Sequence, residues 1–221
     1  MDLDEFVTAN APREGRDSFE LENSKLLDID VDGSVLVKAG SMVAFEGDLS
    51  FTGKSSAEGV SRASSNRPPA ARGPRDDRRG HRHGVRRRSG KRIQVLTLDE
   101  GESVSVNGND VLAFEDRVSY EIGTVGSLAG ASAAGLTNVY LSGPGTVAIT
   151  THGDPLVLTP PVKTDPQATV AWSGDLSPGI ETNRSLGDMV GQSSDERYQM
   201  SFDGDEGFVV IQPYEEGPAD R

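Results

Sequence analysis

The stretch Gly40-Ser-Met-Val-Ala-Phe-Glu46 returns, one residue longer, as Gly108-Asn-Asp-Val-Leu-Ala-Phe-Glu115. Each copy begins at a glycine, which tolerates the backbone of a tight turn, and continues into a short apolar segment of strand length. Before each copy, apolar and polar residues alternate, as in Leu27-Asp-Ile-Asp-Val31 and Val104-Ser-Val106. Alternation with a period of two is typical of half-buried β-strands. The two blocks therefore predict a β-unit that is repeated in the chain.

The same pattern extends over most of the chain. Asp32-Gly33 and Asn107-Gly108 predict hairpin turns, because glycine accepts positive φ. Further strands are expected over 139–158 (a third, looser copy of the unit), 170–172 (with the only tryptophan), 198–202 and 208–212. The chain therefore predicts an all-β fold with minimal helix, in which related β-sandwich-like units are repeated with pseudo-symmetry.

Helical periodicity is nearly absent. Residues 2–8 predict one or two helical turns in which Phe6 and Val7 dock on the rest of the protein, and 186–190 predicts a short helix capped by Ser185 or Asn183. We divide the chain into an N-terminal segment (1–17), one repeated β domain (18–215) and a tail (216–221).

Charge is distributed very unevenly. Residues 59–92 hold twelve of the 22 basic residues and only two of the 35 acidic ones, a net charge of +10, so the remainder of the chain carries −23. A surface this acidic repels itself in dilute buffer and is screened at high salt. The composition favours a protein of a saline cytoplasm over an ordinary acidic one.

Residues 59–90 interrupt every pattern. They hold dense arginine and three prolines and show no alternation. Two interpretations are open. The segment is a disordered basic loop, or it is read out of frame, because shifted codons allowed for 76–90 spell a turn, an alternating strand and a turn much like residues 142–153. If the residues are genuine, neighbouring strand edges lose their partners and become prone to aggregation.

The sequence also bounds the cellular setting. The acidic start, Met1–Glu5, lacks the basic-then-apolar layout of a signal peptide. No run of about 20 apolar residues is present, as a membrane-spanning helix requires. The chain has no cysteine, which excludes disulfides, zinc–thiolate sites and thiol catalysis. We expect a soluble, cytoplasmic protein.

Histidine positions suggest chemistry but also have structural explanations. His81 and His83 are spaced to share one strand face, as in metal-binding β-helices, but the flanking arginines would repel a cation. His152 and Asp154, beside Thr150 and Thr151, suggest hydrolase chemistry. No oxyanion hole is indicated there, so a turn with a solvated histidine is the favoured interpretation.

The remaining motifs are weaker. Gly143-x-Gly145 precedes a strand, whereas a dinucleotide site needs a helix there. The arginines of 78–88 could bind phosphates but lack aromatic residues for base stacking, and high salt would weaken them. Two acidic pairs could chelate calcium but are better explained as a solvated acidic face; they are Asp28 with Asp30 and Glu115 with Asp116. We therefore predict no catalytic, cofactor-binding or metal-binding residue, and no cofactor.

Several segments together resemble the altered inheritance of mitochondria protein 24 family. They are Lys38-Ala-Gly-Ser-Met-Val-Ala44, Leu112-Ala-Phe114, Ser142-Gly-Pro-Gly-Thr-Val147, Ala171-Trp172 and Phe202-Asp-Gly-Asp-Glu-Gly-Phe-Val-Val-Ile-Gln212. The resemblance covers most of residues 19–58 and 91–215. It implies a fold similar to the tryptophan-RNA-binding attenuator type, a short double-stranded β-helix repeated with rough three-fold symmetry, and it supplies no catalytic residues to transfer. Mitochondrial relatives are tied to inner-membrane organisation, a role that does not carry over because the chain shows no presequence.

These observations favour a non-enzymatic β-scaffold that acts by assembly or binding, with self-association as the expected partnership. One alternative is a ligand-binding or enzymatic β-helix whose site is built from backbone and hydroxyl groups. A second alternative is nucleic-acid binding through residues 60–90, which we consider unfavoured.

Overall fold

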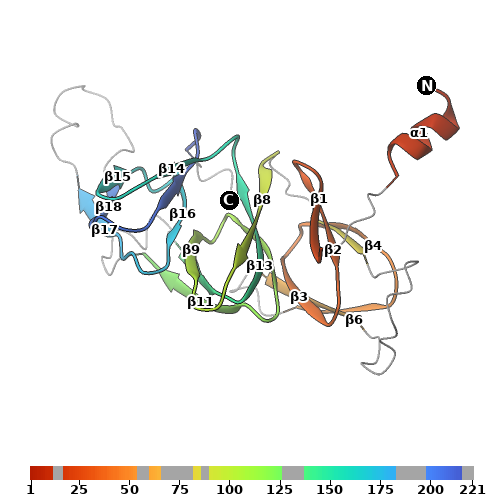
Figure 1. Ribbon diagram of the computed structural model, residues 1–221, viewed down its shortest axis with the longest axis horizontal. Helices are drawn as coiled ribbons and strands as arrows, with labels where there is room; N and C mark the ends of the chain where they lie inside the picture. Colours follow the sequence, from red (N-terminus) through yellow and green to blue (C-terminus); the bar gives the residue numbers. More distant parts are fainter. Residues whose placement is uncertain are drawn as a thin grey trace.

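The computed structural model describes residues 1–11, 17–53, 60–65, 82–85, 90–125, 137–182 and 198–215. These residues form one α-helix and nineteen β-strands, which are arranged in four antiparallel sheets. The all-β prediction is confirmed. Figure 1 shows the strands as three β-bodies side by side along the longest axis of the molecule.

Eighteen of the strands fall into three successive sets of six, which we call the first, second and third set. The first set is β2 (Leu26–Asp30), β3 (Ser34–Lys38), β4 (Met42–Phe45), β5 (Leu49–Gly53), β6 (Val60–Ser65) and β7 (Arg82–Val85). The second is β8 (Arg92–Leu98), β9 (Ser103–Asn107), β10 (Val111–Glu115), β11 (Ser119–Thr124), β12 (Thr137–Ser142) and β13 (Gly145–Thr151). The third is β14 (Leu156–Leu158), β15 (Val162–Thr164), β16 (Thr169–Ser173), β17 (Gly179–Thr182), β18 (Tyr198–Phe202) and β19 (Val209–Ile211).

Strand pairing follows the same order in every set. The sixth strand pairs with the first and the third, and the fifth pairs with the second and the fourth. The irregularity in register between the third and sixth strands also recurs, at Met42/Ala44, Val111/Ala113 and Thr169/Ala171. One further strand, β1 (Phe19–Asn23), pairs with β2. The third set begins at β14, so residues 139–151 complete the second set, whereas the sequence placed the third copy at 139–158.

The turn between the second and third strands is closed by the same backbone hydrogen bond in each set. The N–H groups of Ser41, Asp110 and Ala168 donate to the carbonyls three residues earlier, at 3.1, 2.8 and 3.2 Å. Gly40 within the first of these turns has φ +78°, a backbone conformation that favours glycine. These turns fix equivalent positions in the three sets: Lys38 and Asn107 end the second strand, and Asp165 directly follows it.

Two six-stranded sheets hold neighbouring sets together. One has the order β5-β6-β3-β10-β13-β8, and the other has the order β11-β12-β9-β16-β19-β14. Each sheet takes three strands from one set and three from the next. The joint is β3 with β10 in the first sheet and β9 with β16 in the second. The two remaining sheets, β1-β2-β7-β4 and β15-β18-β17, lie at the ends of the series.

The core follows this arrangement. Three clusters of buried apolar side chains combine residues of different sets, such as Leu36 with Phe114 and Val170 in the central cluster. Trp172, predicted to lie on a strand, is buried on β16, with its ring centroid 5.7 Å from that of Phe202. Burial of aromatic side chains of this size contributes strongly to stability.

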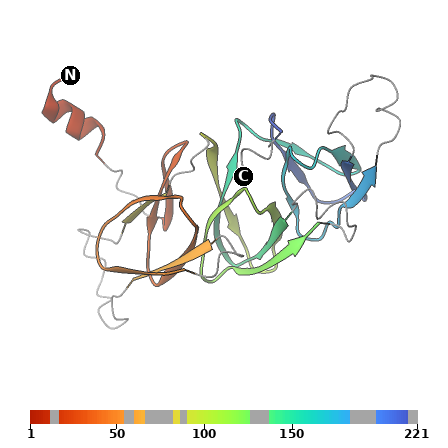
Figure 2. The same ribbon diagram turned by 180° about the vertical axis from the view of Figure 1, so that it is seen from behind.

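The N-terminal helix α1 (Leu3–Ala9) is present, but the prediction that it docks is wrong. Phe6 and Val7 are 55% and 59% exposed, and no residue of the helix is buried. The helix projects away from the sheets in both views, so its apolar side chains meet no surface (Figures 1 and 2). Asp2 caps it by accepting a 2.8 Å hydrogen bond from the Glu5 N–H. The helix expected at 186–190 and the tail at 216–221 lie outside the described residues.

The basic segment contributes two strands, where its residue pattern alone predicts a loop. β6 pairs with β3 and β5, and β7 pairs with β2 and β4. Strand pairing uses backbone groups that every non-proline residue carries, so it proceeds without an alternating apolar pattern. Ala63 on β6 is buried in the core. The rest of 59–90, apart from Gly90, lies outside the described residues, and the out-of-frame interpretation stays a prediction.

Candidate functional site

The hydrolase-like residues lie at the end of β13 but serve separate contacts. Thr150 and Thr151 are fully buried, and their hydroxyls bond to Asp110 and to the Gly153 carbonyl. The His152 ring packs 4.3 Å from that of Tyr214, measured between centroids. Asp154 forms an exposed ion pair with Arg92. A nucleophilic hydroxyl must reach a substrate, so these buried threonines do not fit that role.

The acidic pair Glu115–Asp116 binds protein groups. Glu115 accepts hydrogen bonds from the Ser18 hydroxyl (2.8 Å), the Thr146 N–H (2.7 Å) and Arg117. Partial burial raises the pKa of Glu115, but these hydrogen bonds outweigh it, and the net pKa lies below the ordinary value of 4.5. Asp116 pairs with Arg62 and accepts a 2.6 Å hydrogen bond from Ser34. The pair thus fastens the first set to the second.

The structure also places several of the other residues that the sequence suggested as possible sites. Asp28 and Asp30 lie on β2, which pairs with β1 and β7. Gly143 lies in the turn between β12 and β13, where a Cβ atom would stand 2.4 Å from the Asp99 carbonyl oxygen, so glycine permits a close backbone approach. His83 is on β7, while His81 and most of 78–88 lie outside the described residues. No group of three or more metal-binding side chains occurs among the described residues.

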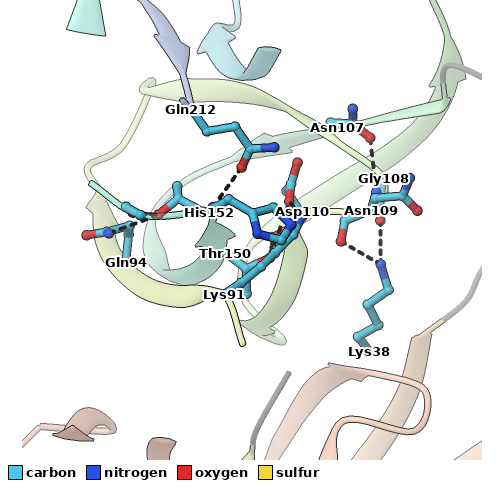
Figure 3. A network of polar contacts seen from close by, with 12 residues as sticks. Lys38, Lys91, Gln94, Asn107, Gly108, Asn109, Asp110, Thr150, His152 and Gln212 are labelled. Carbon is cyan, nitrogen blue, oxygen red and sulfur yellow. Dashed lines mark hydrogen bonds and ion pairs between the residues drawn. The ribbon is translucent and has the colours of Figure 1, made fainter. Parts of the chain in front are cut away.

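A buried polar network, which the sequence did not reveal, lies in the second set (Figure 3). Lys91 precedes β8, and its ammonium group pairs with Asp110, in the turn before β10. The Thr150 hydroxyl lies 3.3 Å from the same carboxylate oxygen, and the Thr150 N–H donates to the Asp110 carbonyl at 2.8 Å. All three side chains are at most 2% exposed. An ion pair this deeply buried is retained only with additional hydrogen bonds, which Thr150 supplies.

Residues of the neighbouring sets reach the same region (Figure 3). Lys38, at the end of β3, donates to the carbonyls of Gly108 (2.9 Å) and Asn109 (2.8 Å). Gln212, after β19, accepts a 2.8 Å hydrogen bond from the His152 N–H. Lys38 thus ties the turn 107–110 to the first set, and Gln212 ties His152, directly after β13, to the third set. The geometry suits a structural junction, because Lys91 and Asp110 face one another and are buried, and Lys38 binds backbone carbonyls.

The sequence carried only a faint signal of this network. Lys91 was counted with the basic stretch 59–92, and Asp110 follows the turn signal Asn107-Gly108 without a role of its own being predicted. Nothing in the spacing of Lys91 and Asp110 indicates contact, because they meet only when β8 and β10 both pair with β13. A lysine next to an apolar strand start was the one available hint.

The two end sheets contain the most unusual surface. Met42, Val43 and Phe45 of β4 are 40%, 55% and 49% exposed. In the equivalent strands β10 and β16 the apolar residues are buried, and none of them is more than 3% exposed. β15 is the outermost strand at the opposite end, and its central Lys163 is exposed. An exposed apolar edge strand is a site for pairing with another chain.

Comparisons with known proteins agree with this fold. The X-ray crystal structure of protein SPYM3_0169 from Streptococcus pyogenes is similar, with a TM-score of 0.68 and 19% identity, over 90% of this chain and 94% of that chain. At this identity the likeness establishes the fold alone. A search of the curated proteins found no match. Within the described residues, no helix is long and apolar enough to cross a membrane. The family model described as "Mitochondrial biogenesis AIM24" matches residues 19–214. Because that match covers most of the chain, the protein belongs to this family, which its sequence motifs already resembled.

Proposed function

We propose that this protein is a non-enzymatic β-scaffold that works by self-association. The observation that carries the proposal is the exposure of the apolar residues of β4. The equivalent residues of β10 and β16 are buried. Large exposed apolar residues on a strand edge are costly in a monomer, because they promote uncontrolled pairing. A partner that covers them removes this cost.

The proposal includes a repeated architecture. We interpret the three sets as copies of one six-strand unit with pseudo-three-fold character, of the short double-stranded β-helix type. The common pairing order, the shared irregularity at the third strand and the common turn hydrogen bond support this interpretation. Repeated units bury their faces against neighbours, so the terminal units of a series need a cap or a partner.

The disposition of polar groups favours a scaffold over an enzyme. Lys91, Asp110 and Thr150 bind one another inside the second set, and Lys38 binds backbone carbonyls. Arg62 and Arg92 pair with Asp116 and Asp154. In these positions the charges hold strands and turns together, whereas phosphate recognition would require cations that are not already engaged with protein groups.

We also propose that the protein works in a saline cytoplasm. The net charge of −13 makes copies repel one another at low salt, and added salt screens that repulsion within a few ångströms at molar concentration. Self-association through apolar strands is therefore expected to strengthen as the salt concentration rises.

Light scattering coupled to size-exclusion chromatography tests the proposal, in high-salt and low-salt buffers and over a range of protein concentrations. The expected result is a defined oligomer in high salt that dissociates as salt is removed. A strict monomer at every salt and protein concentration would overturn self-association as the function.

A further inference from the structure

Neighbouring sets are joined by a single type of strand pair. The second strand of one set lies antiparallel to the third strand of the next, as β3 with β10 and β9 with β16. The registers match. Ala113 and Phe114 stand opposite Val37 and Leu36, and Ala171 and Trp172 stand opposite Val106 and Ser105. The same joint therefore occurs twice within one chain.

Each end of the molecule has one of the two strands that form such a joint. β15 is the second strand of the third set and the outermost strand of the sheet β15-β18-β17. β4 is the third strand of the first set and the outermost strand of the sheet β1-β2-β7-β4. The two strands lie at opposite ends of the long axis in both views, so they do not pair within one molecule (Figures 1 and 2).

The side chains of β4 correspond to those that the joint buries elsewhere. Pairing with the sixth strand aligns Ala44 with Ala113 and Ala171, and it aligns Phe45 with Phe114 and Trp172. Phe114 and Trp172 are at most 3% exposed, whereas Phe45 is 49% exposed. The difference follows from the neighbouring strand, since Phe114 and Trp172 have one on that side.

We propose that β15 of one copy of this protein pairs antiparallel with β4 of a second copy. The turn positions Lys38, Asn107 and Asp165 are equivalent, which makes Thr164 equivalent to Val37 and Val106. The expected register places Ala44 opposite Thr164 and Phe45 opposite Lys163. The pairing completes a third sheet, β17-β18-β15-β4-β7-β2, with the same order of strands as the two that exist in each chain.

The chemistry of this register is favourable. Lys163 pairs with Glu181 on β17 and is exposed, so its ammonium group stays in solvent while its aliphatic stem covers the Phe45 ring. A lysine on a free edge strand also discourages pairing with unrelated strands. The joint is head to tail, because β4 and β15 are different surfaces. Such an interface forms a ring if the rotation closes and a filament if it does not.

One feature makes the joint between copies weaker than the joint between the first and second sets of a chain. Lys38 donates to two carbonyls of the turn in the next set, at 2.9 and 2.8 Å. Asp165 occupies the equivalent position directly after β15, and its carboxylate accepts a hydrogen bond from the Gln167 N–H of its own turn at 2.6 Å. A carboxylate cannot donate to carbonyls, so this clamp is absent between copies.

Engineered cysteines test the pairing. Because the chain has no cysteine of its own, the engineered cysteines can form disulfides only with each other. The inference rests on the self-association proposed above and specifies its surfaces. The double variant Phe45→Cys/Lys163→Cys, oxidised in high salt, is expected to give a ladder of disulfide-linked multimers on a non-reducing gel. Each single variant gives dimers at most. The control Phe45→Cys/Val157→Cys uses Val157, which is also exposed and lies on another edge strand, β14. A ladder no stronger than this control would overturn the pairing.

A charge variant separates failure of this inference from failure of the proposed function. Val43→Asp places a carboxylate on β4 and is expected to reduce the oligomer to monomer, while the matched variant Val157→Asp leaves it intact. If the wild-type protein is oligomeric and Val43→Asp remains so, self-association stands and the β15–β4 pairing is wrong. If the wild-type protein is monomeric, both proposals fail.

Discussion

Strands β4 and β10 carry nearly the same residues and have opposite surroundings. Val43-Ala-Phe45 is exposed, whereas Leu112-Ala-Phe114 is at most 1% exposed. Both strands pair with the sixth strand of their own set, but only β10 has a strand from the preceding set on its other side. The comparison teaches that burial here is decided by the neighbouring strand. The residues of β4 resemble those of a buried strand, and we propose that a second copy of the protein covers them.

The largest expected difference between the two strands comes from a charge at equivalent positions. Leu112→Asp buries a carboxylate among apolar side chains and is expected to cost more than about 4 kcal/mol, enough to unfold most of the protein. Val43→Asp is expected to change the stability of the monomer by about 0.5 kcal/mol or less, because position 43 faces solvent. Urea unfolding followed by circular dichroism, at a protein concentration low enough to keep the chain monomeric, measures both.

Equal destabilisation by the two variants would contradict the comparison. It would mean that β4 is covered within the single chain, in conflict with its exposure. Protection of Val43 from hydroxyl-radical labelling in the wild-type protein, at a low protein concentration, would lead to the same conclusion.

Alternation and glycine turns were sufficient to predict the all-β class. They failed at β6 and β7, where pairing depends on the backbone of neighbouring strands and the side chains carry no alternating pattern. They also failed for Phe6 and Val7. A helical pattern predicts an apolar side of a helix, but it does not predict that a surface lies opposite that side.

A second contrast concerns two lysines. Lys91 is buried with Asp110, whereas Lys163 pairs with Glu181 at the surface, where Lys163 lowers the pKa of that carboxyl. Lys91→Met leaves an uncompensated buried carboxylate and is expected to cost about 3–5 kcal/mol. Lys163→Met is expected to cost about 0–1 kcal/mol. Urea unfolding midpoints of the two variants at neutral pH give the comparison.

A double variant refines the interpretation of the buried pair. Replacing both partners, as Lys91→Met/Asp110→Leu, removes the unpaired charge and is expected to recover most of the loss, because a buried ion pair and an apolar pair are often of similar stability. No recovery would show that the network has a role in packing beyond its charges. This network was beyond sequence reasoning, since its partners come from the starts of two strands that never pair with each other directly.

Replacement of Lys38 is expected to cause an intermediate loss of stability. Its two hydrogen bonds to the turn 107–110 join the first set to the second. Lys38→Met leaves both carbonyls without these donors, and hydrogen bonds from a charged group contribute about 1.5–3 kcal/mol. The expected loss in urea unfolding lies in that range. A larger loss than that of Lys91→Met would reverse our ranking of the two lysines.

A smaller loss than at Lys38 is expected at Glu115, whose counterpart Glu46 follows β4 and is exposed. Glu115 has a folded-state pKa below the ordinary value of 4.5, because hydrogen bonds from Thr146, Ser18 and Arg117 outweigh the opposing effect of burial. A carboxyl with a lowered folded pKa stabilises the protein above its unfolded pKa, and this contribution disappears as the pH falls through the folded value.

Glu115→Gln should therefore lower stability at neutral pH by about 1 kcal/mol and by progressively less as the pH falls below 4.5. Urea midpoints measured from neutral to acid pH should converge for the wild-type protein and the variant. The control Glu46→Gln should follow the wild-type curve throughout. Parallel curves for Glu115→Gln would mean that the stability difference does not arise from the ionised carboxylate of Glu115.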